Sequence, residues 1–210
     1  MDKRIILPIG FTCLLLAVRI IITGELTYIF LVWNLFLAWI PYAISQSVAG
    51  GISRQRWKEF TLLGLWLLFL PNAPYIITDL LHLKHRAPVP YWYDVLLLFS
   101  AALNGLMLGF ASLLKVEQFL AGRFSKRVST FLILCTFFLC AFGIYAGRWL
   151  RWNSWDVFLN PAEIAGDILD RLLNPFAHFR TWAVTLLFGS FLYIAYFTLK
   201  NFIYTKTSKT

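Results

Sequence analysis

The sequence predicts an all-α membrane protein, a bundle of about six transmembrane helices. Of its 210 residues 60% are hydrophobic and only 14% are charged, whereas soluble domains average about 45–50% apolar and about 25% charged residues. Apolar stretches of about 20 residues, long enough to cross a bilayer as a helix, recur along the chain. No internal repeat and no low-complexity linker is visible, so we expect a single membrane domain over residues 1–210.

Six segments fit the length and composition of a transmembrane helix. The first begins like a signal peptide, with Lys3 and Arg4 before an apolar run. Arg19 interrupts that run and no small-residue cleavage site follows it, so we expect an uncleaved helix. Three cysteines fall inside apolar segments, and we interpret them as small buried residues rather than as a disulfide or zinc framework. The predicted spans are 5–22, 28–49, 60–82, 94–116, 129–147 and 181–203, and the cysteines are Cys13, Cys135 and Cys140.

The distribution of basic residues predicts the orientation. If the N-terminus is inside, 12 Lys and Arg residues fall on the cytoplasmic side and 6 on the outer side, without counting Arg19. Short loops rich in Lys and Arg stay in the cytoplasm, so both termini are expected there. The formal net charge of +9 is then explained by topology and by contact with anionic lipid, and nucleic-acid binding is not expected.

The connection between the last two spans, about 148–180, is long for so compact a chain. Inside it, "NPAEIAGDILDRLLNPF" carries helix start signals, with Asn160 as a cap, Pro161 in the first turn and then Glu163. Apolar residues recur every four positions at Ile164, Ile168 and Leu172, so the pattern predicts an amphipathic helix over 161–173. At about 13 residues it is too short to span a bilayer, and we expect it to lie at the outer interface. A surface helix that closes the bundle and a lid over a site both fit.

The third span contains two prolines that an undisturbed helix cannot accommodate. We therefore predict a break or strong kink at 71–74, near the middle of the bilayer, with Asn72 capping the outer half-helix. Beyond the break, Tyr75, Asp79 and His82 share one face of a regular α-helix. Asp79 and His82 are spaced to share a proton or to bind one metal ion, although two ligands alone are a weak metal motif.

Further polar residues gather at the predicted outer ends of the other spans. Asp94 begins the fourth span, where a carboxylate also suits the helix dipole. The fifth span ends in "GRWLRWNSWD", whose Trp residues suit the headgroup layer. We predict that these polar groups form one pocket that opens outward. Its members are Asp79, His82, Asp94, Arg148, Arg151, Asn153 and Asp156, with Asn72 and Tyr75 beside them. Asn34 in the second span is expected to form an interhelical hydrogen bond, and Arg19 to reach the interface or to pair with one of the acids.

Four of these stretches resemble an uncharacterised bacterial membrane family, domain of unknown function 1361. They are "WNLFLAWIP", "FLPNAPYIITDLLHL", "WYD" and "GRWLRWNSWD". The resemblance implies a multi-pass bacterial membrane protein, and it implies no activity, substrate or catalytic residue.

Three kinds of function fit the sequence. In the first, the pocket binds or processes a lipid or cell-envelope ligand that carries phosphate. Arg148 and Arg151 would hold the phosphate, with Asn153, Asp156, Asn72 and Tyr75 also touching the ligand. Asp79, His82 and Asp94 would supply acid–base catalysis, or Asp79, His82, Asp94 and Asp156 would hold a divalent metal ion.

The other two kinds of function need no reaction. In the second, the chain is a non-catalytic scaffold or partner protein whose polar residues form structural salt bridges. In the third, it is a small transporter or channel, in which the broken span and the Asp–His pair couple protons or substrate. The sequence leaves open whether the chain is an enzyme, what its ligand is and how many copies associate.

Overall fold

The computed structural model describes residues 3–50 and 56–207, and within them every regular element is helical. An all-α architecture is therefore confirmed. In chain order, the elements are α1 (Lys3–Thr23), α2 (Phe30–Ala49), α3 (Arg56–Phe69), α4 (Asn72–Tyr75), the 3₁₀ helix η1 (Ile76–His82), α5 (Tyr91–Ala121), α6 (Lys126–Tyr145), the π-helix η2 (Ala146–Leu150), α7 (Asp156–Leu159), α8 (Pro161–Leu173) and α9 (Phe179–Thr207).

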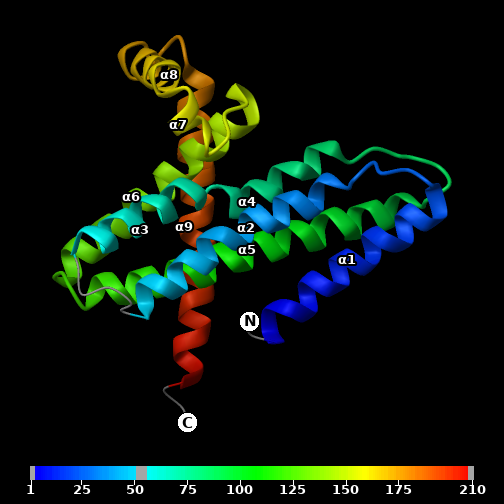
Figure 1. The fold of residues 1–210 in the computed structure, drawn as a ribbon, viewed down its shortest axis with the longest axis horizontal. Coiled ribbons are helices and arrows are strands. Elements are labelled where there is room, and N and C mark those ends of the chain that lie inside the picture. Colours follow the sequence, from blue (N-terminus) through cyan, green and yellow to red (C-terminus); the bar gives the residue numbers. More distant parts are fainter. Residues whose placement is uncertain (1–2, 51–55, 208–210) are drawn as a thin grey trace. The chain divides into compact units, whose positions relative to one another are not determined.

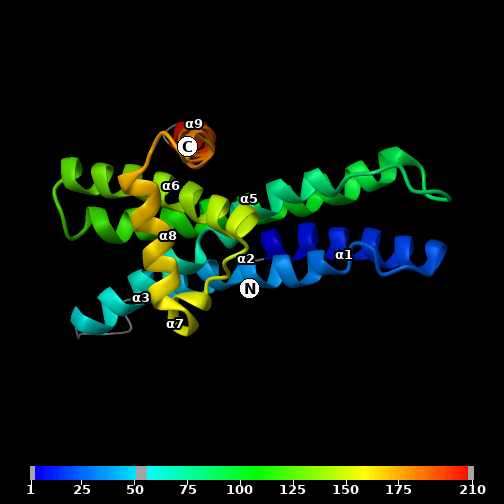
Figure 2. The same ribbon diagram turned by 90° about the horizontal axis from the view of Figure 1, so that it is seen from above.

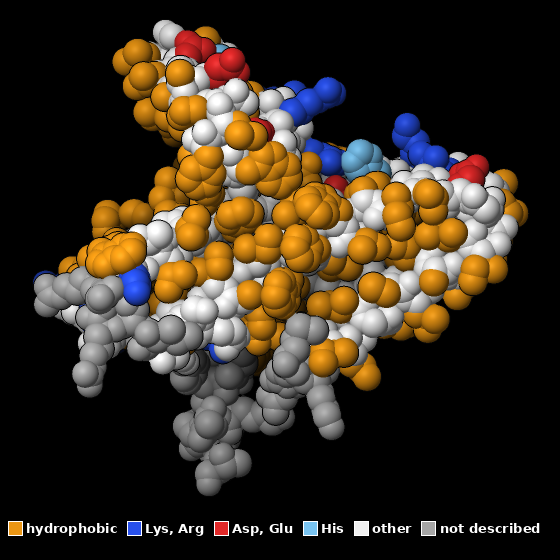
Figure 3. Space-filling view, in the orientation of Figure 1, with side chains coloured by type: hydrophobic (Ala, Val, Ile, Leu, Met, Phe, Trp, Pro, Cys, Tyr) orange, Lys and Arg blue, Asp and Glu red, His pale blue; other side chains and the backbone are white. Residues whose placement is uncertain are grey.

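Six helical stretches of the described chain are long and apolar enough to cross a membrane. They are Ile5–Thr23, Phe30–Ala49, Trp57–His82, Tyr91–Ala121, Lys126–Leu150 and Phe179–Phe202, and each overlaps one predicted span. Large apolar side chains are exposed along them, for example Leu7 and Ile21, which are 79% and 81% exposed. Hydrophobic side chains are also spread widely over the face drawn in Figure 3. A helix surface of this kind fits lipid rather than water, so the chain is a multi-pass membrane protein.

The chain forms two compact units, residues 1–119 and 120–210. In unit 1, α1, α2 and α5 run alongside one another (Figures 1 and 2), and α2 also packs on α3, α4 and η1. Buried Leu16, Leu31, Leu97 and Leu98 form part of its core. In unit 2, α6 packs against α9, which crosses it at a steep angle in Figure 1.

The predicted break in the third span is present. Helix α3 ends at Phe69, and the chain resumes as the single turn α4 and then as the tighter η1. Two glycines of α5 make room for this irregular segment. A methyl group added at Gly105 would lie 2.3 Å from the backbone oxygen of Ala73, and one added at Gly109 would lie 3.2 Å from the Ala73 side chain. The broken span therefore fits against α5 only where α5 has no side chain.

The amphipathic helix predicted at 161–173 corresponds to α8, which has these same bounds. Pro161 occupies its first turn and Glu163 follows, as expected, because the first turn of a helix needs no donor from proline and favours a negative charge. Asn160 is at the N-cap position, but its side chain makes no capping hydrogen bond. Leu169, Leu172 and Leu173 are exposed, so α8 presents an unburied apolar face.

Candidate functional site

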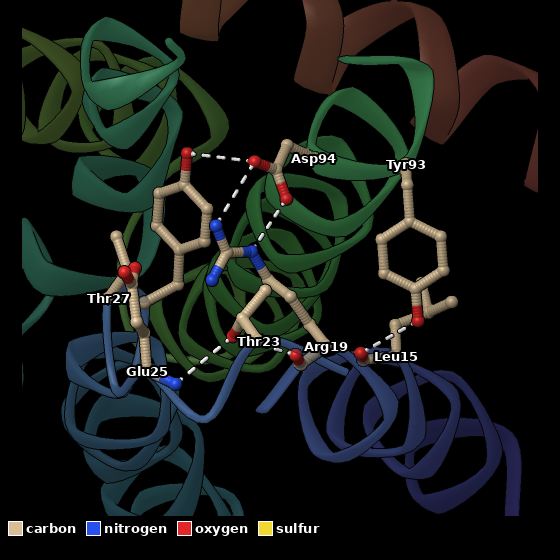
Figure 4. Close-up of polar contacts among 8 residues, drawn as sticks. Leu15, Arg19, Thr23, Glu25, Thr27, Tyr93 and Asp94 are labelled. Carbon is tan, nitrogen blue, oxygen red and sulfur yellow. Dashed lines mark hydrogen bonds and ion pairs between the residues drawn. The ribbon is translucent and has the colours of Figure 1, made fainter. Parts of the chain in front are cut away.

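A seam of polar contacts joins α1 to α5 inside unit 1. The Thr12 hydroxyl donates to the Ser100 hydroxyl at 2.9 Å, and the Asn104 amide donates to Thr12 Oγ1 at 2.8 Å. The Tyr93 hydroxyl donates to the backbone oxygen of Leu15 at 2.8 Å (Figure 4). These contacts follow one face of each antiparallel helix, so the seam fixes the register of α1 against α5.

The seam ends in a buried ion pair. Arg19 Nε lies 2.7 Å from Asp94 Oδ1, and Arg19 Nη2 lies 3.4 Å from Oδ2 (Figure 4). Both side chains are only 1% exposed. The Asp94 carboxylate also accepts a hydrogen bond from the Tyr28 hydroxyl at 3.4 Å. Asp94 therefore holds a buried arginine in place, which is a structural role, and Arg19 pairs with one of the acids as expected.

Tyr28 completes this cluster from the turn between α1 and α2. Its ring lies under the Arg19 guanidinium, with 4.5 Å between Arg19 Cζ and the ring centroid. Burial raises the pKa of Tyr28 and the Asp94 carboxylate raises it further, while the positive charges of Arg19 and Arg86 oppose the shift. The hydroxyl thus remains protonated at neutral pH and acts as a donor.

Asp79 lies elsewhere in unit 1. Its carboxylate is 1% exposed and accepts a hydrogen bond of 2.7 Å from Asn34 Nδ2. The interhelical hydrogen bond expected for Asn34 is thereby confirmed. His82 is the last residue of η1, and its side chain is exposed. Its ring contacts the Phe30 ring edge-on, with centroids 5.3 Å apart. Asp79 is therefore a buried, hydrogen-bonded acid within a membrane-spanning segment.

The expectation that Tyr75 shares a face with Asp79 and His82 is wrong, because the segment is not an α-helix. Residues three apart align in a 3₁₀ helix, so Asp79 stays in line with His82. Tyr75 aligns instead with Thr78, whose hydroxyl donates to the Tyr75 backbone oxygen at 2.7 Å.

The capping role expected for Asn72 is also wrong. Pro71 takes the N-cap position of α4 and makes no side-chain capping hydrogen bond there. Asn72 instead donates to the backbone oxygen of Phe69 at 2.9 Å, at the end of α3. The reason is that proline removes backbone donors beyond the break, so the last carbonyl oxygens of α3 need side-chain donors.

Unit 2 holds the second group of predicted site residues, at the end of α6. Arg148 lies in the π-helix η2, and Arg151 follows it with φ 62° and ψ 26°. Among the described residues, Arg151 is the only one other than glycine with a positive φ. A left-handed conformation costs an ordinary residue roughly 1–2 kcal/mol, and π-helical turns are frequent at functional sites. Two rare backbone conformations therefore follow one another here, a π-helical turn at Arg148 and a left-handed residue at Arg151.

Local contacts hold the loop that follows. The Asn153 backbone nitrogen donates to Asp156 Oδ2 at 2.7 Å, and the Asn153 side-chain amide donates to the same oxygen at 3.1 Å. Asp156 thus closes a turn at the start of α7, which is a structural role. Trp152 Nε1 donates to Asp167 Oδ2 at 2.7 Å, and Arg171 lies 3.0 Å from Asp167 Oδ1. The Trp152 contact ties the loop to α8, and the Arg171 contact, which lies within α8, holds the Asp167 carboxylate in place.

The predicted site residues thus divide between the two units. Asp79, His82 and Asp94 belong to unit 1, whereas Arg148, Arg151, Asn153 and Asp156 belong to unit 2. One pocket that contains all of them stays a prediction. Within the described residues, no three His, Cys, Asp or Glu side chains form a group that could hold a metal ion, and we propose no metal role.

Sequence reasoning singled out Arg19 and Asp94 but missed the other members of this group in unit 1. The missed residues are Thr12, Tyr28, Arg86, Ser100 and Asn104. Thr12 and Arg19 are seven residues apart, and Asn104, Ser100 and Asp94 recur along one side of α5. Polar residues at helical spacing inside two apolar spans are a usable signal for such a seam. Tyr28 and Arg86 gave no signal, since an aromatic residue and a basic residue in loops fit the membrane interface equally well.

These helices and their buried polar contacts define a multi-pass membrane protein of the all-α class. The chain belongs to the family described as Protein of unknown function (DUF1361), whose model matches residues 33–195. That range includes all four stretches on which the resemblance rested. No curated protein and no solved structure matches the chain.

Proposed function

We propose that this chain binds a lipid or cell-envelope ligand that carries a phosphate group, in the cytoplasmic membrane of a bacterium. Arg148 and Arg151 hold the phosphate. The observation that carries the proposal is the pair of rare backbone conformations at these residues, a π-helical turn followed by a left-handed residue. Strained backbone persists where the surrounding structure enforces it, and it concentrates at binding sites.

The surroundings of the two arginines support this role. Trp149 stacks on Tyr145, with ring centroids 5.5 Å apart, and Arg180 lies over Trp149 at 5.4 Å from the ring centroid. Aromatic residues and arginines together favour the headgroup layer of a bilayer, where lipid phosphates lie. A guanidinium group offers several N–H donors in a plane, so two of them can bind one phosphate through directed hydrogen bonds.

A pair of lipids that differ only in phosphate tests the proposal. Binding of dioleoyl phosphatidic acid and of dioleoylglycerol to the purified full chain in a neutral detergent would be measured by native mass spectrometry. We expect the phosphatidic acid to bind and the dioleoylglycerol not to bind. Arg148→Gln and Arg151→Gln should each weaken binding about tenfold or more, because each removes charge-assisted hydrogen bonds.

Arg127→Gln is the matched control, since Arg127 is an exposed residue in the first turn of α6, the helix that leads into η2. It removes the same charge at the other end of the helix and should leave binding unchanged. An equal loss of phosphatidic acid binding in all three variants would mean that binding depends only on net charge, and it would contradict the proposed site.

A second candidate is a non-catalytic scaffold whose polar residues only stabilise the fold. The closed Arg19–Asp94 pair favours it, because both charges are buried and face one another. Under this proposal no phosphate-specific binding occurs, and substitution of both Arg19 and Asp94 by apolar residues of similar size leaves the chain functional.

A further inference from the structure

The Arg19–Asp94 pair leaves part of the arginine unused. Asp94 engages Nε and Nη2 of Arg19, and the Tyr28 ring covers one face of the guanidinium. Arg19 Nη1 is buried and has no hydrogen-bond partner within the described part of the chain. Arg19 is 1% exposed, and because buried polar groups nearly always have a partner, the missing acceptor of Nη1 calls for an explanation.

A second guanidinium acts on the same tyrosine. Arg86 belongs to the segment between η1 and α5, and its positive charge acts on the Tyr28 hydroxyl together with that of Arg19. Arg86 Nε is likewise buried without an acceptor among the described residues. Two arginines, each with an unsatisfied donor, thus act electrostatically on one tyrosine in the connection between α1 and α2.

The charges of this cluster do not balance. Arg19 and Arg86 contribute two positive charges, and Asp94 contributes one negative charge. Glu25 belongs to the same turn, but its carboxylate accepts a hydrogen bond of 2.9 Å from the Thr27 hydroxyl and is exposed. The neighbours of Arg86 in sequence, Lys84 and His85, add no acid. An anion from outside the chain would supply both the missing charge and the missing acceptors.

We propose that Arg19 and Arg86, beside Tyr28, form an anion-binding site for a phosphate group. In this site Asp94 orients Arg19 by engaging two of its nitrogens, so that Nη1 is held ready for the ligand, and Arg86 contributes the second guanidinium. The site lies wholly within unit 1 and does not depend on the site proposed for Arg148 and Arg151. The phosphate can come from a lipid headgroup or from a free phosphate ion.

The test measures phosphate binding to the full chain in a neutral detergent, in the Arg148→Gln/Arg151→Gln background so that only the unit 1 site contributes. The probes are inorganic phosphate, dioleoyl phosphatidic acid and dioleoylglycerol, each titrated against thermal stability. Arg86→Gln is the main variant, because it leaves the Arg19–Asp94 pair intact. We expect it to raise the apparent Kd for the bound phosphate at least tenfold, and we expect Arg86→Lys to restore part of the affinity.

Lys84→Gln is the matched control, since it removes an equal charge from an exposed position in the same segment, and it should leave the Kd unchanged. Binding of inorganic phosphate would identify a free-ion site, and binding of the phosphatidic acid alone would identify a lipid headgroup site. Three results would overturn the proposal: no binding of any probe in this background, equal losses for Arg86→Gln and Lys84→Gln, or binding of dioleoylglycerol as strong as that of the phosphatidic acid. If binding survives here but wild type binds no more strongly than the double variant, the proposal for Arg148 and Arg151 fails and this one stands.

Discussion

The buried Arg19–Asp94 pair gives the sharpest prediction for stability. Asp94→Ala removes the acceptor of two arginine contacts, of 2.7 and 3.4 Å, and of one tyrosine contact of 3.4 Å. It leaves a guanidinium that is 1% exposed without its counter-charge. Breaking one side of a buried ion pair typically costs about 3–5 kcal/mol, so we expect the free energy of unfolding to fall by that amount.

The double substitution Arg19→Met/Asp94→Leu should behave differently. It removes both charges together and fills the same space with apolar side chains, so no charge is left unpaired in the bilayer. Replacements of this kind are often neutral or stabilising. We therefore expect the double variant to unfold at nearly the wild-type free energy, which gives a coupling energy of several kcal/mol between the two positions.

Unfolding by SDS in mixed micelles, followed by tryptophan fluorescence, measures wild type, Asp94→Ala, the double variant and its two single variants Arg19→Met and Asp94→Leu on one scale. The reasoning would be refuted if Asp94→Ala lowered the free energy of unfolding by less than about 1 kcal/mol. It would equally be refuted if the double variant lost as much as the two single variants combined, since the cost would then come from shape rather than from an unpaired charge.

Three further predictions concern other elements. Gly105→Ala should lower the free energy of unfolding by about 1–3 kcal/mol in the same SDS titration, because the new methyl would lie 2.3 Å from a backbone oxygen of α4. Gly64→Ala, with nothing within 4 Å, should be neutral or stabilising by up to about 1 kcal/mol, and similar losses in both variants would argue against close packing. Hydrogen bonds from Asn174 and His178 lower the pKa of Asp170 from its ordinary 3.8. These hydrogen bonds therefore stabilise the fold fully above pH 3.8, and their contribution is lost as the pH falls through the lowered pKa. Asp170→Asn should therefore flatten the acid side of a plot of melting temperature against pH, and an unchanged slope would contradict the assignment. Arg151→Gly should raise the melting temperature, because glycine adopts φ 62° without strain, while it weakens phosphatidic acid binding.

The membrane spans could be predicted because they depend on local composition alone. A run of apolar residues meets the bilayer wherever the rest of the chain lies, and so the six spans and α8 were located from sequence. The break at Pro71 and Pro74 was predictable for the same reason, since proline affects its own helix. The tightening of Ile76–His82 into a 3₁₀ helix was not, because it depends on how that segment packs.

The partners of the buried acids could not be assigned from sequence. Asp79 and Asp94 each had several candidate donors, and only the register of α1 and α2 against the rest of unit 1 decides between them. In that register, Arg19 pairs with Asp94, and Asn34 donates a hydrogen bond to Asp79. Arg86 entered the sequence prediction only as one positive charge in the count that set the orientation. The burial of its guanidinium could not be predicted, because residues distant in the chain determine how deeply a loop residue is buried.

The pairing of Arg19 with Asp94 also has a consequence for biogenesis. The two residues are 75 positions apart, and at about 5–20 residues per second the ribosome completes Asp94 roughly 4–15 seconds after Arg19. During that interval the first helix carries a charge that costs about 2.5–3.5 kcal/mol when it lies alone at the bilayer centre. The helix can lower this cost by keeping Arg19 near the headgroups or by waiting at the insertion machinery. We therefore expect the first helix to reach its final depth in lipid only after α5 has been inserted and Asp94 can pair with Arg19.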